Sequence, residues 1–340
     1  MLISLCERGL VPDFLTRFGI RRLCQTRLRD EYAGDWQARQ KAFVAVLRQS
    51  PLAIETAAAN QQHYEVPALF YERCLGKRLK YSSCYYPTGT ETLDQAEQAM
   101  LALYCERAEL SDGMDILELG CGWGSLTLWM AEHYPNARIT TVSNSHSQRA
   151  FIEQRAAQRG LNNIKVITID VNQLELAQAQ FDRCVSIEMF EHMRNYDTLL
   201  ARIAAWLKPS GKLFVHIFCH REIAYPYETE GEDNWMGRYF FTGGQMPAFD
   251  TFRHFAQHLR IEQDWRVNGS HYQRTSNHWL ENTDRHRDEI IALFAQTYGP
   301  EQAGLWLQRW RMFYMACAEL FGYGSGEEWL VGHYRFVRTS

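Results

Sequence analysis

The spacing of apolar residues divides the chain into a helical N-terminal part and a longer part in which helices and strands alternate. Between residues 35 and 76, apolar residues recur at intervals of three and four, which is typical of helices that bury one face. Pro51 and Pro67 interrupt this pattern. We therefore expect residues 1–80 to form an N-terminal helical layer without obvious chemistry of its own.

From residue 92 onward, short apolar runs alternate with amphipathic stretches. Strands separated by helices of this length predict a parallel sheet covered on both faces. Right-handed crossovers then make this α/β sheet doubly wound and Rossmann-like, with residues 81–220 as its core. The expected helices cover residues 92–110 (with Thr92 as N-cap), 125–134, 146–160 and 195–211, and the expected strands cover 116–120, 137–145, 164–170, 181–188 and 212–220.

The regular alternation ends after His220. Residues 221–247 mix Pro, Gly, acids and aromatics, and they predict an irregular cover segment. A helical insertion before the last strand is expected to lie above the sheet as a lid. We expect a helix at 248–259, a sixth strand at 260–269, two helices within 275–322 and a last strand at 327–338, so that 221–323 form the substrate pocket and 324–340 complete the sheet.

Composition and charge exclude several classes of function. The formal net charge is −4 and the pI is about 6.3, so the chain has no basic field suited to nucleic acid. Its nine cysteines include no CxxC pair, which favours a reducing, cytoplasmic setting over a disulfide framework. Charged residues interrupt the apolar start, so we expect no signal peptide and no membrane span. The spacing of His, Cys and acidic residues predicts no metal site.

A glycine-rich turn connects an apolar strand to a helix in the stretch ILELGCGWGS, residues 116–125. Glycines such as Gly120 and Gly122 let the backbone turn sharply and approach a ligand without a Cβ in the way. The N-terminus of the following helix suits a carboxylate or a phosphate. The pattern is G-x-G-x-G, not the nicotinamide pattern G-x-G-x-x-G, and no G-K-[ST] follows. We predict a ligand site here, with a tight turn without a ligand as the alternative.

The run E-x-G-C-G-x-G, which begins at Glu118, resembles motif I of the class I S-adenosylmethionine (SAM)-dependent methyltransferases. Dinucleotide folds often carry an acid at the end of the second strand, whereas that end reads TTVSNSHSQ here. This departure points to the cyclopropane-fatty-acid synthase family and its relatives, the coclaurine-type N-methyltransferases. The resemblance covers roughly residues 60–338 and is carried by YSSCYY, SNSHSQ, FDRCVSIEMFEHM, LFVHIFCH, RYFFTGGQMP and ELFGYGSGEEW. It implies a class I methyltransferase fold, SAM as cofactor and S-adenosylhomocysteine (SAH) as product.

The resemblance also implies which residues contact SAM. The Tyr and Ser that open YSSCYY touch SAM in the family, and SNSHSQ does so at the ribose end. The end of the third strand would lie beside the adenine. The implied SAM-binding residues are Tyr81, Ser82, Glu118, Gly120, Gly122, Ser143, Asn144, Gln148, Asp170 and Val171.

The two branches of this family differ in chemistry, and a few positions favour one of them. The synthases are similar to this chain at most positions that hold a bicarbonate base, but one cysteine of that set is Ser83 here. Glu188 stands where the synthases typically have glycine, and the coclaurine-type enzymes carry glutamate there, in the same EMFEHM. We therefore expect N-methylation, with cyclopropane synthesis on unsaturated phospholipid acyl chains as the alternative. The bicarbonate positions that do match are Glu191, His216, Tyr272 and Cys317, of which Cys317 favours the alternative.

Methyl transfer to an amine requires that the ammonium form first loses a proton. Glu188, Glu191 and His192 are spaced i, i+3 and i+4, so on a helical turn they would share one face. They follow the fourth strand, at the rim where open α/β sheets bind ligands. We expect them to deprotonate or position the amine, with helix capping as the alternative for Glu191 and His192. Whether the base is a protein group or a bicarbonate stays open, and for His216 a core role weighs as much as a catalytic one.

Aromatic residues concentrate in the second half of the chain and predict a cavity that holds a cationic substrate by cation–π contact. We expect a small secondary or tertiary, aromatic or alkaloid-like amine. A SAM-binding regulator without catalysis is disfavoured, because residues suited to proton abstraction are present. No nucleic acid or membrane partner is expected, and a homodimer is compatible with the sequence. The expected pocket residues are His216, Phe240, Phe241, Tyr272, Cys317 and Trp329, and Tyr81 is a further cation–π candidate.

Overall fold

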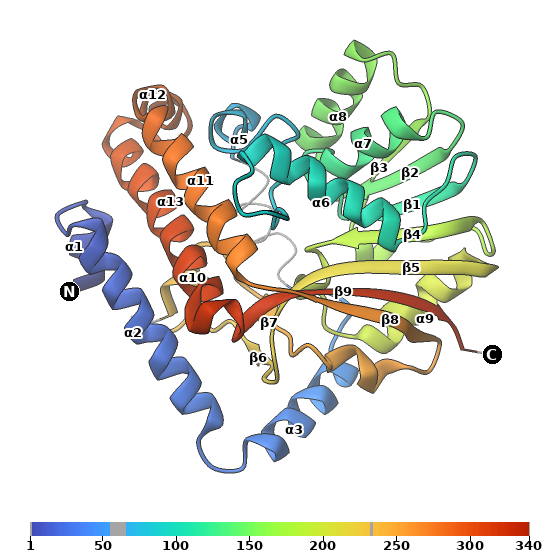
Figure 1. Ribbon diagram of the computed structural model, residues 1–340, viewed down its shortest axis with the longest axis horizontal. Coiled ribbons are helices and arrows are strands. Elements are labelled where there is room, and N and C mark those ends of the chain that lie inside the picture. The colour runs from blue at the N-terminus through green and yellow to red at the C-terminus, as the bar shows by residue number, and fades with distance from the viewer. Residues whose placement is uncertain (1, 55–65, 232–233, 340) are drawn as a thin grey trace.

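The alternating segments form a seven-stranded sheet in the computed structural model, which describes residues 2–54, 66–231 and 234–339 (Figure 1). Its strands are β1 (Asp115–Leu119), β2 (Arg138–Ser143), β3 (Ile164–Thr168), β4 (Phe181–Ile187), β5 (Leu207–His220), β8 (Leu259–Val267) and β9 (Trp329–Arg338). The strand order is β3-β2-β1-β4-β5-β9-β8. Strands β1 to β5 pair in parallel, and β9 runs antiparallel between β5 and β8. The predicted parallel core is therefore confirmed.

Successive residues of the central strands pack into two hydrophobic cores, one on each face of the sheet. On β4, Val185 belongs to one core and Cys184 to the other. Phe214 and Val215 on β5 divide in the same way. Because side chains alternate along a strand, an apolar run of this kind is buried only if both faces are covered.

Helices supply that cover. Those of the parallel core are α6 (Leu93–Arg107), α7 (Ser125–His133), α8 (His146–Gln158) and α9 (Tyr196–Trp206). Helices α6 and α7 contribute to the first core, and α9 to the second. The predicted N-cap Thr92 is confirmed, because its hydroxyl accepts from the Gln95 amide while the Gln95 side chain accepts from the Thr92 amide.

The described part of the N-terminal layer is helical, and residues 55–65 of the expected layer lie outside the described residues. Its helices are α1 (Leu2–Glu7), α2 (Asp13–Tyr32), α3 (Trp36–Gln49) and α5 (Ala68–Cys74). Helix α2 packs along α13 (Pro300–Phe321), where Arg17 and Arg21 both pair with Glu319 at 2.8 and 2.6 Å (Figure 1). Helix α3 packs instead on α9.

The part after β5 departs from the sequence-based expectation in two places. The prediction of a helix at 248–259 is wrong. Ala248 forms a β-bridge with His220, and β8 already begins at Leu259. Between them the chain makes only one 3-10 turn, Thr251–Phe255. The other elements of this part are β6 (Tyr225–Pro226), α10 (Trp235–Tyr239) and β7 (Gln245–Met246).

The two helices expected within 275–322 are in fact three, namely α11 (Ser270–Arg285), α12 (Arg287–Tyr298) and α13. Helices α12 and α13 are separate because Gly299 has a φ of +89° and Pro300 starts the next helix. The three helices form a cluster beside the sheet, together with α5 (Figure 1).

Candidate active site

The glycine-rich turn after β1 shapes the first wall of the site. Gly120 and Gly122 have φ values of +82° and +51°, which L side chains rarely adopt. A Cβ on Gly120 would lie 2.8 Å from Met189, whereas a Cβ on Gly122 would meet nothing within 4 Å. The backbone at Gly122 therefore faces open space, and the N-terminus of α7 follows directly. This is the geometry predicted for a ligand-binding turn.

Two cavities meet at this turn. The main cavity has a volume of about 120 Å³ and reaches from the glycine turn to Glu188, Phe241 and Tyr272. The side cavity, of about 80 Å³, reaches toward the ends of β2 and β3. Gly120 and Gly122 line both cavities, so the two adjoin at the glycine turn, and together they are called the hollow below.

The structure distributes the implied SAM-binding residues over this hollow. Asp170 lines neither cavity; its side chain caps the turn Val171–Gln173 by accepting from the Asn172 amide at 2.7 Å. The main cavity is lined by Tyr81, Ser82, Glu118, Gly120, Gly122 and Gln148, and the side cavity by Gly120, Gly122, Ser143, Asn144, Gln148 and Val171.

Several buried polar atoms on these walls lack a hydrogen-bond partner among the described residues. They are the Gln148 Nε2, the Trp123 Nε1 and the Ser125 Oγ. Buried polar groups are rarely left unpaired, so such atoms fit a polar ligand in the hollow. Trp123 and Ser125 were not singled out from the sequence, although both lie within ILELGCGWGS.

Glu118 is held by the protein itself. Its Oε2 accepts from the hydroxyls of Thr127 and Thr141, the latter at 3.0 Å. The carboxyl is buried, and burial raises its pKa to about 7 against the lowering effect of the two hydroxyls. Glu118 thus ties β1 to β2 and α7 beneath the glycine turn.

Glu188 lies on the opposite wall of the main cavity and has three hydrogen-bond donors. Its Oε1 accepts from the Ser83 amide at 3.0 Å and lies 3.0 Å from the His216 Nε2. Its Oε2 accepts from the Tyr272 hydroxyl at 2.8 Å. These groups come from the segment before α6, from β5 and from α11, so the fold gathers distant parts of the chain around one carboxyl group.

The predicted helical turn that would align Glu188 with Glu191 and His192 is wrong. Glu188 has a φ of +47°, outside the 3-10 turn Phe190–His192. A left-handed conformation is strained in a residue with a Cβ, and here the surrounding hydrogen bonds hold it, including that of the Glu188 amide to the His216 carbonyl at 2.9 Å.

A buried lysine that the sequence did not reveal lies next to Glu188. The Lys80 Nζ donates to the Ser82 hydroxyl at 2.6 Å and to the Ser83 carbonyl at 2.5 Å, and Lys80 lines the main cavity. Burial raises the pKa of Glu188 to about 7, and the Lys80 cation, the Ser83 amide and the Tyr272 hydroxyl oppose this rise. Glu188 therefore exchanges its proton close to neutral pH.

Glu191 is a contrasting case. Its side chain is fully buried, its Oε1 accepts from the Phe218 amide at 2.8 Å, and it lines neither cavity. Burial, followed by the negative charge of Glu188, raises its pKa well above the usual range, so Glu191 keeps its proton. The capping alternative is wrong for both Glu191 and His192, because Asn195 caps the following helix and accepts from the Thr198 amide.

Of the residues expected in the substrate pocket, the structure brings two to the main cavity. Phe241 stacks on His192 at 4.9 Å, with 16° between the rings, and Tyr272 binds Glu188. Phe218 and Phe313 also line the cavity and were not predicted. The other expected residues line neither cavity: His216 lies behind Glu188, Phe240 stacks on Phe313, Cys317 is buried on α13, and Trp329 donates to the Tyr225 hydroxyl.

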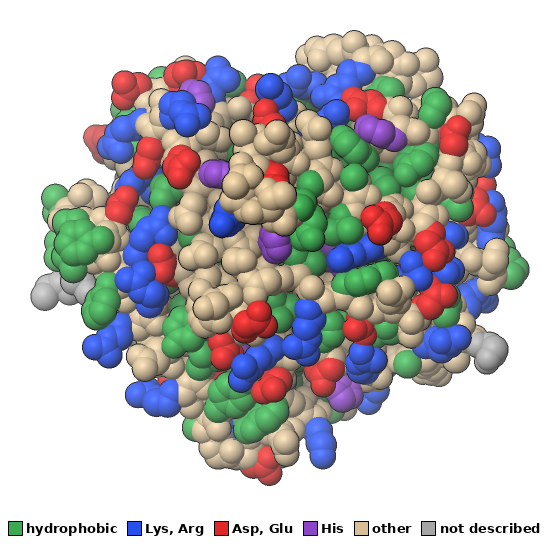
Figure 2. All heavy atoms as spheres, viewed as in Figure 1, with side chains coloured by type: hydrophobic (Ala, Val, Ile, Leu, Met, Phe, Trp, Pro, Cys, Tyr) green, Lys and Arg blue, Asp and Glu red, His purple; other side chains and the backbone are tan. Residues whose placement is uncertain are grey.

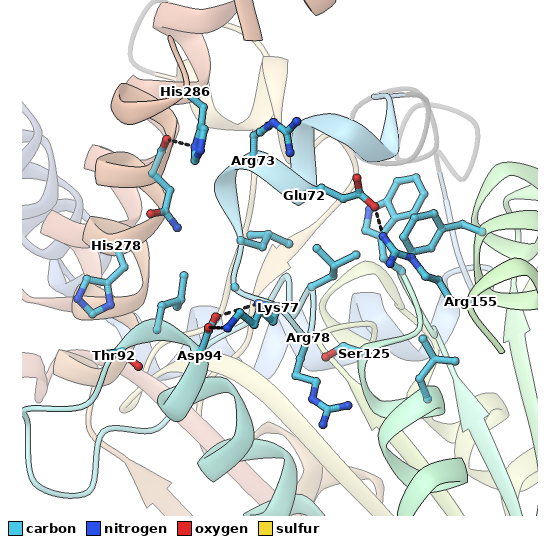
Figure 3. Close-up of a pocket in the computed structure, with 18 of the residues that line it drawn as sticks. Glu72, Arg73, Lys77, Arg78, Thr92, Asp94, Ser125, Arg155, His278 and His286 are labelled. Carbon is cyan, nitrogen blue, oxygen red and sulfur yellow. Dashed lines mark hydrogen bonds and ion pairs between the residues drawn. The ribbon is translucent and has the colours of Figure 1, made fainter. Parts of the chain in front are cut away.

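Figure 3 shows an outer cleft of about 600 Å³. Its lining shares Leu79, Trp123 and Ser125 with the main cavity. Much of its basic character is neutralised by pairing: Figure 3 shows Arg155 directed at Glu72. Among the described residues, no cluster of His, Cys, Asp and Glu is arranged to hold a metal ion. Glu188, the glycine turn and most of the implied SAM-binding residues line the main and side cavities, so the candidate active site is the hollow that these cavities form.

Known proteins match this chain closely. The profile of the family described as mycolic acid cyclopropane synthetase matches residues 53–328. The chain belongs to this family. (S)-Coclaurine N-methyltransferase of Thalictrum flavum subsp. glaucum is 38% identical over 345 residues, which cover 99% of this chain and 95% of that protein.

Solved structures agree with this assignment. The crystal structure of coclaurine N-methyltransferase bound to N-methylheliamine and SAH matches with a TM-score of 0.95 at 37% identity, and the match covers 99% of this chain and 98% of that one. The cyclopropane synthase MmaA2 from Mycobacterium tuberculosis matches with a TM-score of 0.71 at 21% identity, over 85% of this chain and 100% of that one, which shows the shared fold.

These matches confirm the predicted family, the class I methyltransferase fold, the enzyme class of a SAM-dependent methyltransferase and SAM as the cofactor.

Within residues 2–54, 66–231 and 234–339, no helix has both the length and the apolar composition needed to cross a lipid bilayer. On the face shown in Figure 2, acidic and basic side chains are interspersed.

Proposed function

We propose that this enzyme transfers the methyl group of SAM to the nitrogen of a small secondary or tertiary amine of aromatic, alkaloid-like character. The observation that carries this proposal is the carboxylate of Glu188, which faces the main cavity and accepts from Ser83, His216 and Tyr272. Relatives that align over the full chain are named as N-methyltransferases of coclaurine and pavine, which supports an amine substrate.

SAM would bind in the hollow beside the glycine turn. Ser143, Asn144, Gln148 and Val171 would hold the adenosine part, and the open face of Gly122 permits close approach of the backbone. Tyr81, Ser82, Trp123 and Ser125 would hold the methionine part from the main cavity, where the Trp123 and Ser125 polar atoms need partners. When bound, SAM supplies an electrophilic methyl group on a sulfonium. The protein's own contribution is alignment of the nucleophile and removal of its proton.

Glu188 is the group suited to take that proton. A cationic amine in the main cavity would be attracted by its carboxylate, and a pKa of about 7 lets Glu188 accept a proton near neutral pH. His192 faces both cavities and would help to orient the amine, while the protonated Glu191 would support β5 from behind. Phe218, Phe241, Tyr272 and Phe313 would surround the cation with aromatic faces.

The position of Glu188 also bears on the alternative, cyclopropane synthesis. The resemblance implies five positions that hold a bicarbonate in the synthases. Two of them correspond to Glu191 and Cys317, and the other three to Ser83, His216 and Tyr272. In this chain all three donate to the Glu188 carboxylate, with Tyr272 and Ser83 at 2.8 and 3.0 Å. A built-in carboxylate in the place of a bound one favours an enzyme that carries its own base.

The test is to incubate the purified protein with SAM and either a panel of secondary and tertiary benzylisoquinoline-type amines or vesicles of unsaturated phospholipid. We expect a mass increase of one methyl group on one or more amines, without added bicarbonate. Conversion of the lipid acyl chains to cyclopropanes without turnover of any amine would contradict the proposal. If the protein gives a SAM-binding isotherm but no methylated product, this result would favour the alternative of a SAM-binding regulator without catalysis.

A further inference from the structure

A line of hydrogen bonds runs from Glu188 across two neighbouring strands to Arg107, in the last turn of α6. The Glu188 Oε1 lies 3.0 Å from the His216 Nε2, the His216 Nδ1 lies 2.9 Å from the His333 Nε2, and the His333 Nδ1 lies 2.7 Å from an Nη of Arg107. His216 and His333 are register partners on β5 and β9, and both side chains are fully buried. Two neighbouring strands, the residue that follows β4 and one helix thus contribute to a single connected line.

Arg107 fixes the direction of this line, because a guanidinium can only donate hydrogen bonds. The His333 Nδ1 must therefore accept, and a neutral His333 then carries its proton on Nε2. That proton points at the His216 Nδ1, which must also accept. A neutral His216 consequently carries its proton on Nε2 and donates it to the Glu188 Oε1.

The surroundings keep both imidazoles neutral. Burial, with the charges of Lys80 and Arg107, holds the pKa of His216 well below its usual range. Burial, with His216, Arg107 and Lys80, does the same for His333. A proton on the His216 Nδ1 would collide with the one from His333, so the Tyr104 hydroxyl, 2.9 Å from that nitrogen, does not accept a hydrogen bond from it.

Glu188 itself faces titratable groups from several elements. Cations and hydrogen-bond donors favour its ionised form, and burial disfavours it. The groups concerned are Lys80 and Cys84 before α6, Tyr104 on α6, Glu191 and His192 after β4, His216 on β5, Tyr272 on α11 and Cys317 on α13.

We propose that Arg107 and His333 are positioning residues that set the tautomer of His216 and so keep a hydrogen-bond donor directed at the Glu188 carboxylate. This inference rests on the proposed role of Glu188 as the base. Without Arg107, His333 is free to place its proton on Nδ1, and His216 can then turn a lone pair toward Glu188. The carboxylate would lose one of its three donors and would hold a proton up to a higher pH.

The first test reads the tautomers directly and does not depend on activity. The full-length protein, labelled with ¹⁵N-histidine, would be studied by long-range ¹H–¹⁵N correlation, with His216→Gln and His333→Gln used to assign the signals. We expect both imidazoles to be neutral with the proton on Nε2. A proton on Nδ1 of either histidine in the wild-type protein overturns the proposal, whatever the protein methylates.

The second test compares Arg107→Met, which removes the donor, with Arg107→Lys, which restores a donor-only cation. Arg107→Met should move the acid limb of the kcat/KM profile to higher pH by about one unit, and Arg107→Lys should move it back. Protonation of the free amine substrate affects the kcat/KM profile of every variant equally, so it does not contribute to the difference between variants. An unshifted acid limb in Arg107→Met overturns the proposal.

Arg335→Met is the matched control for this comparison. Both arginines pack over the ring of Trp265, Arg335 at 5.6 Å and Arg107 at 4.9 Å from its centroid. Arg335 also donates to the Arg107 carbonyl. Among the described residues, however, only Arg107 of the two donates to one of these histidines. Arg335→Met should lower stability without moving the acid limb. If the wild-type protein methylates no amine, the proposed function fails, while the tautomers still decide the positioning proposal.

Discussion

The two walls of the main cavity are built in different ways. The cofactor wall comes largely from one contiguous stretch, the turn from β1 into α7, in which the glycines and the buried Glu118 lie within a few residues of one another. The opposite wall presents Glu188, which Ser83, His216 and Tyr272 hold from three other parts of the chain. The first wall is formed by the local conformation of the backbone, and the second depends on tertiary contacts that hold a charged side chain.

This difference separates binding from chemistry. A backbone turn with a helix N-terminus can hold SAM without a titratable group. The opposite wall can exchange a proton near neutral pH, because burial and the Lys80 cation act on Glu188 in opposite directions. Changes on the cofactor wall should therefore alter SAM affinity, and changes on the opposite wall should alter turnover.

The largest expected effect is that of Glu188→Gln. Loss of the base should lower kcat by about 100-fold or more, since general base catalysis contributes about 10²–10⁴-fold. The affinity for SAM, measured by isothermal titration calorimetry, should change little. The matched variant Glu191→Gln should cost less than Glu188→Gln, because Glu191 is already protonated. Equal losses in the two variants would contradict the division of roles between the glutamates.

On the cofactor wall, Gly122→Ala should weaken SAM binding by about tenfold, because the new methyl group enters the open space beside the turn and strains a backbone at a φ of +51°. Gly113→Ala is the control: Gly113 also has a positive φ, +82°, and open space around it, but it lines neither cavity. Both variants should lose stability, and only Gly122→Ala should lose affinity. Similar SAM affinities in the two would remove the ligand role of the turn.

How far each wall could be predicted from the sequence follows from the same difference. The strand, the glycines and the helix of the cofactor wall are neighbours in ILELGCGWGS, so spacing alone predicted the turn. The opposite wall was only partly predictable. EMFEHM drew attention to Glu188 and His192, but their helical spacing suggested a shared helical face that the positive φ of Glu188 rules out.

Lys80, Arg107 and His333 had no signal in the sequence. Each looks like an ordinary residue of its segment, and each acquires its role from tertiary contacts. His333 lies opposite His216 only because of the β5–β9 register, and Arg107 reaches it from the last turn of α6. Register and burial of this kind are set by packing across the sheet, which no local pattern encodes.

A smaller effect is expected from Phe241→Leu. Loss of the aromatic face should raise KM for a cationic amine by about three- to tenfold, with kcat changed less, since such a contact contributes about 0.5–1 kcal/mol or more. A quaternary ammonium inhibitor should lose affinity in Phe241→Leu, whereas a neutral analogue of the same shape should not. The control Phe249→Leu alters a buried ring of the other core and should leave both affinities unchanged. Equal losses for charged and neutral inhibitors would indicate packing rather than cation–π binding.

The smallest effect should come from Glu118→Gln and should appear in stability. Burial raises the pKa of Glu118 from 4.5 to about 7, so the native state holds this proton in a pH range where the unfolded chain has released it. The contribution of this group to stability is therefore complete below its unfolded pKa and is lost as pH rises through about 7. Between pH about 5 and about 8, the wild-type melting temperature should fall by about 2 °C more than that of Glu118→Gln. Glu175→Gln, at an exposed carboxyl, should fall like the wild type. If Glu118→Gln shows the same pH dependence as the wild type, the carboxyl is ionised in the folded protein, and the two hydroxyls that bind it outweigh its burial.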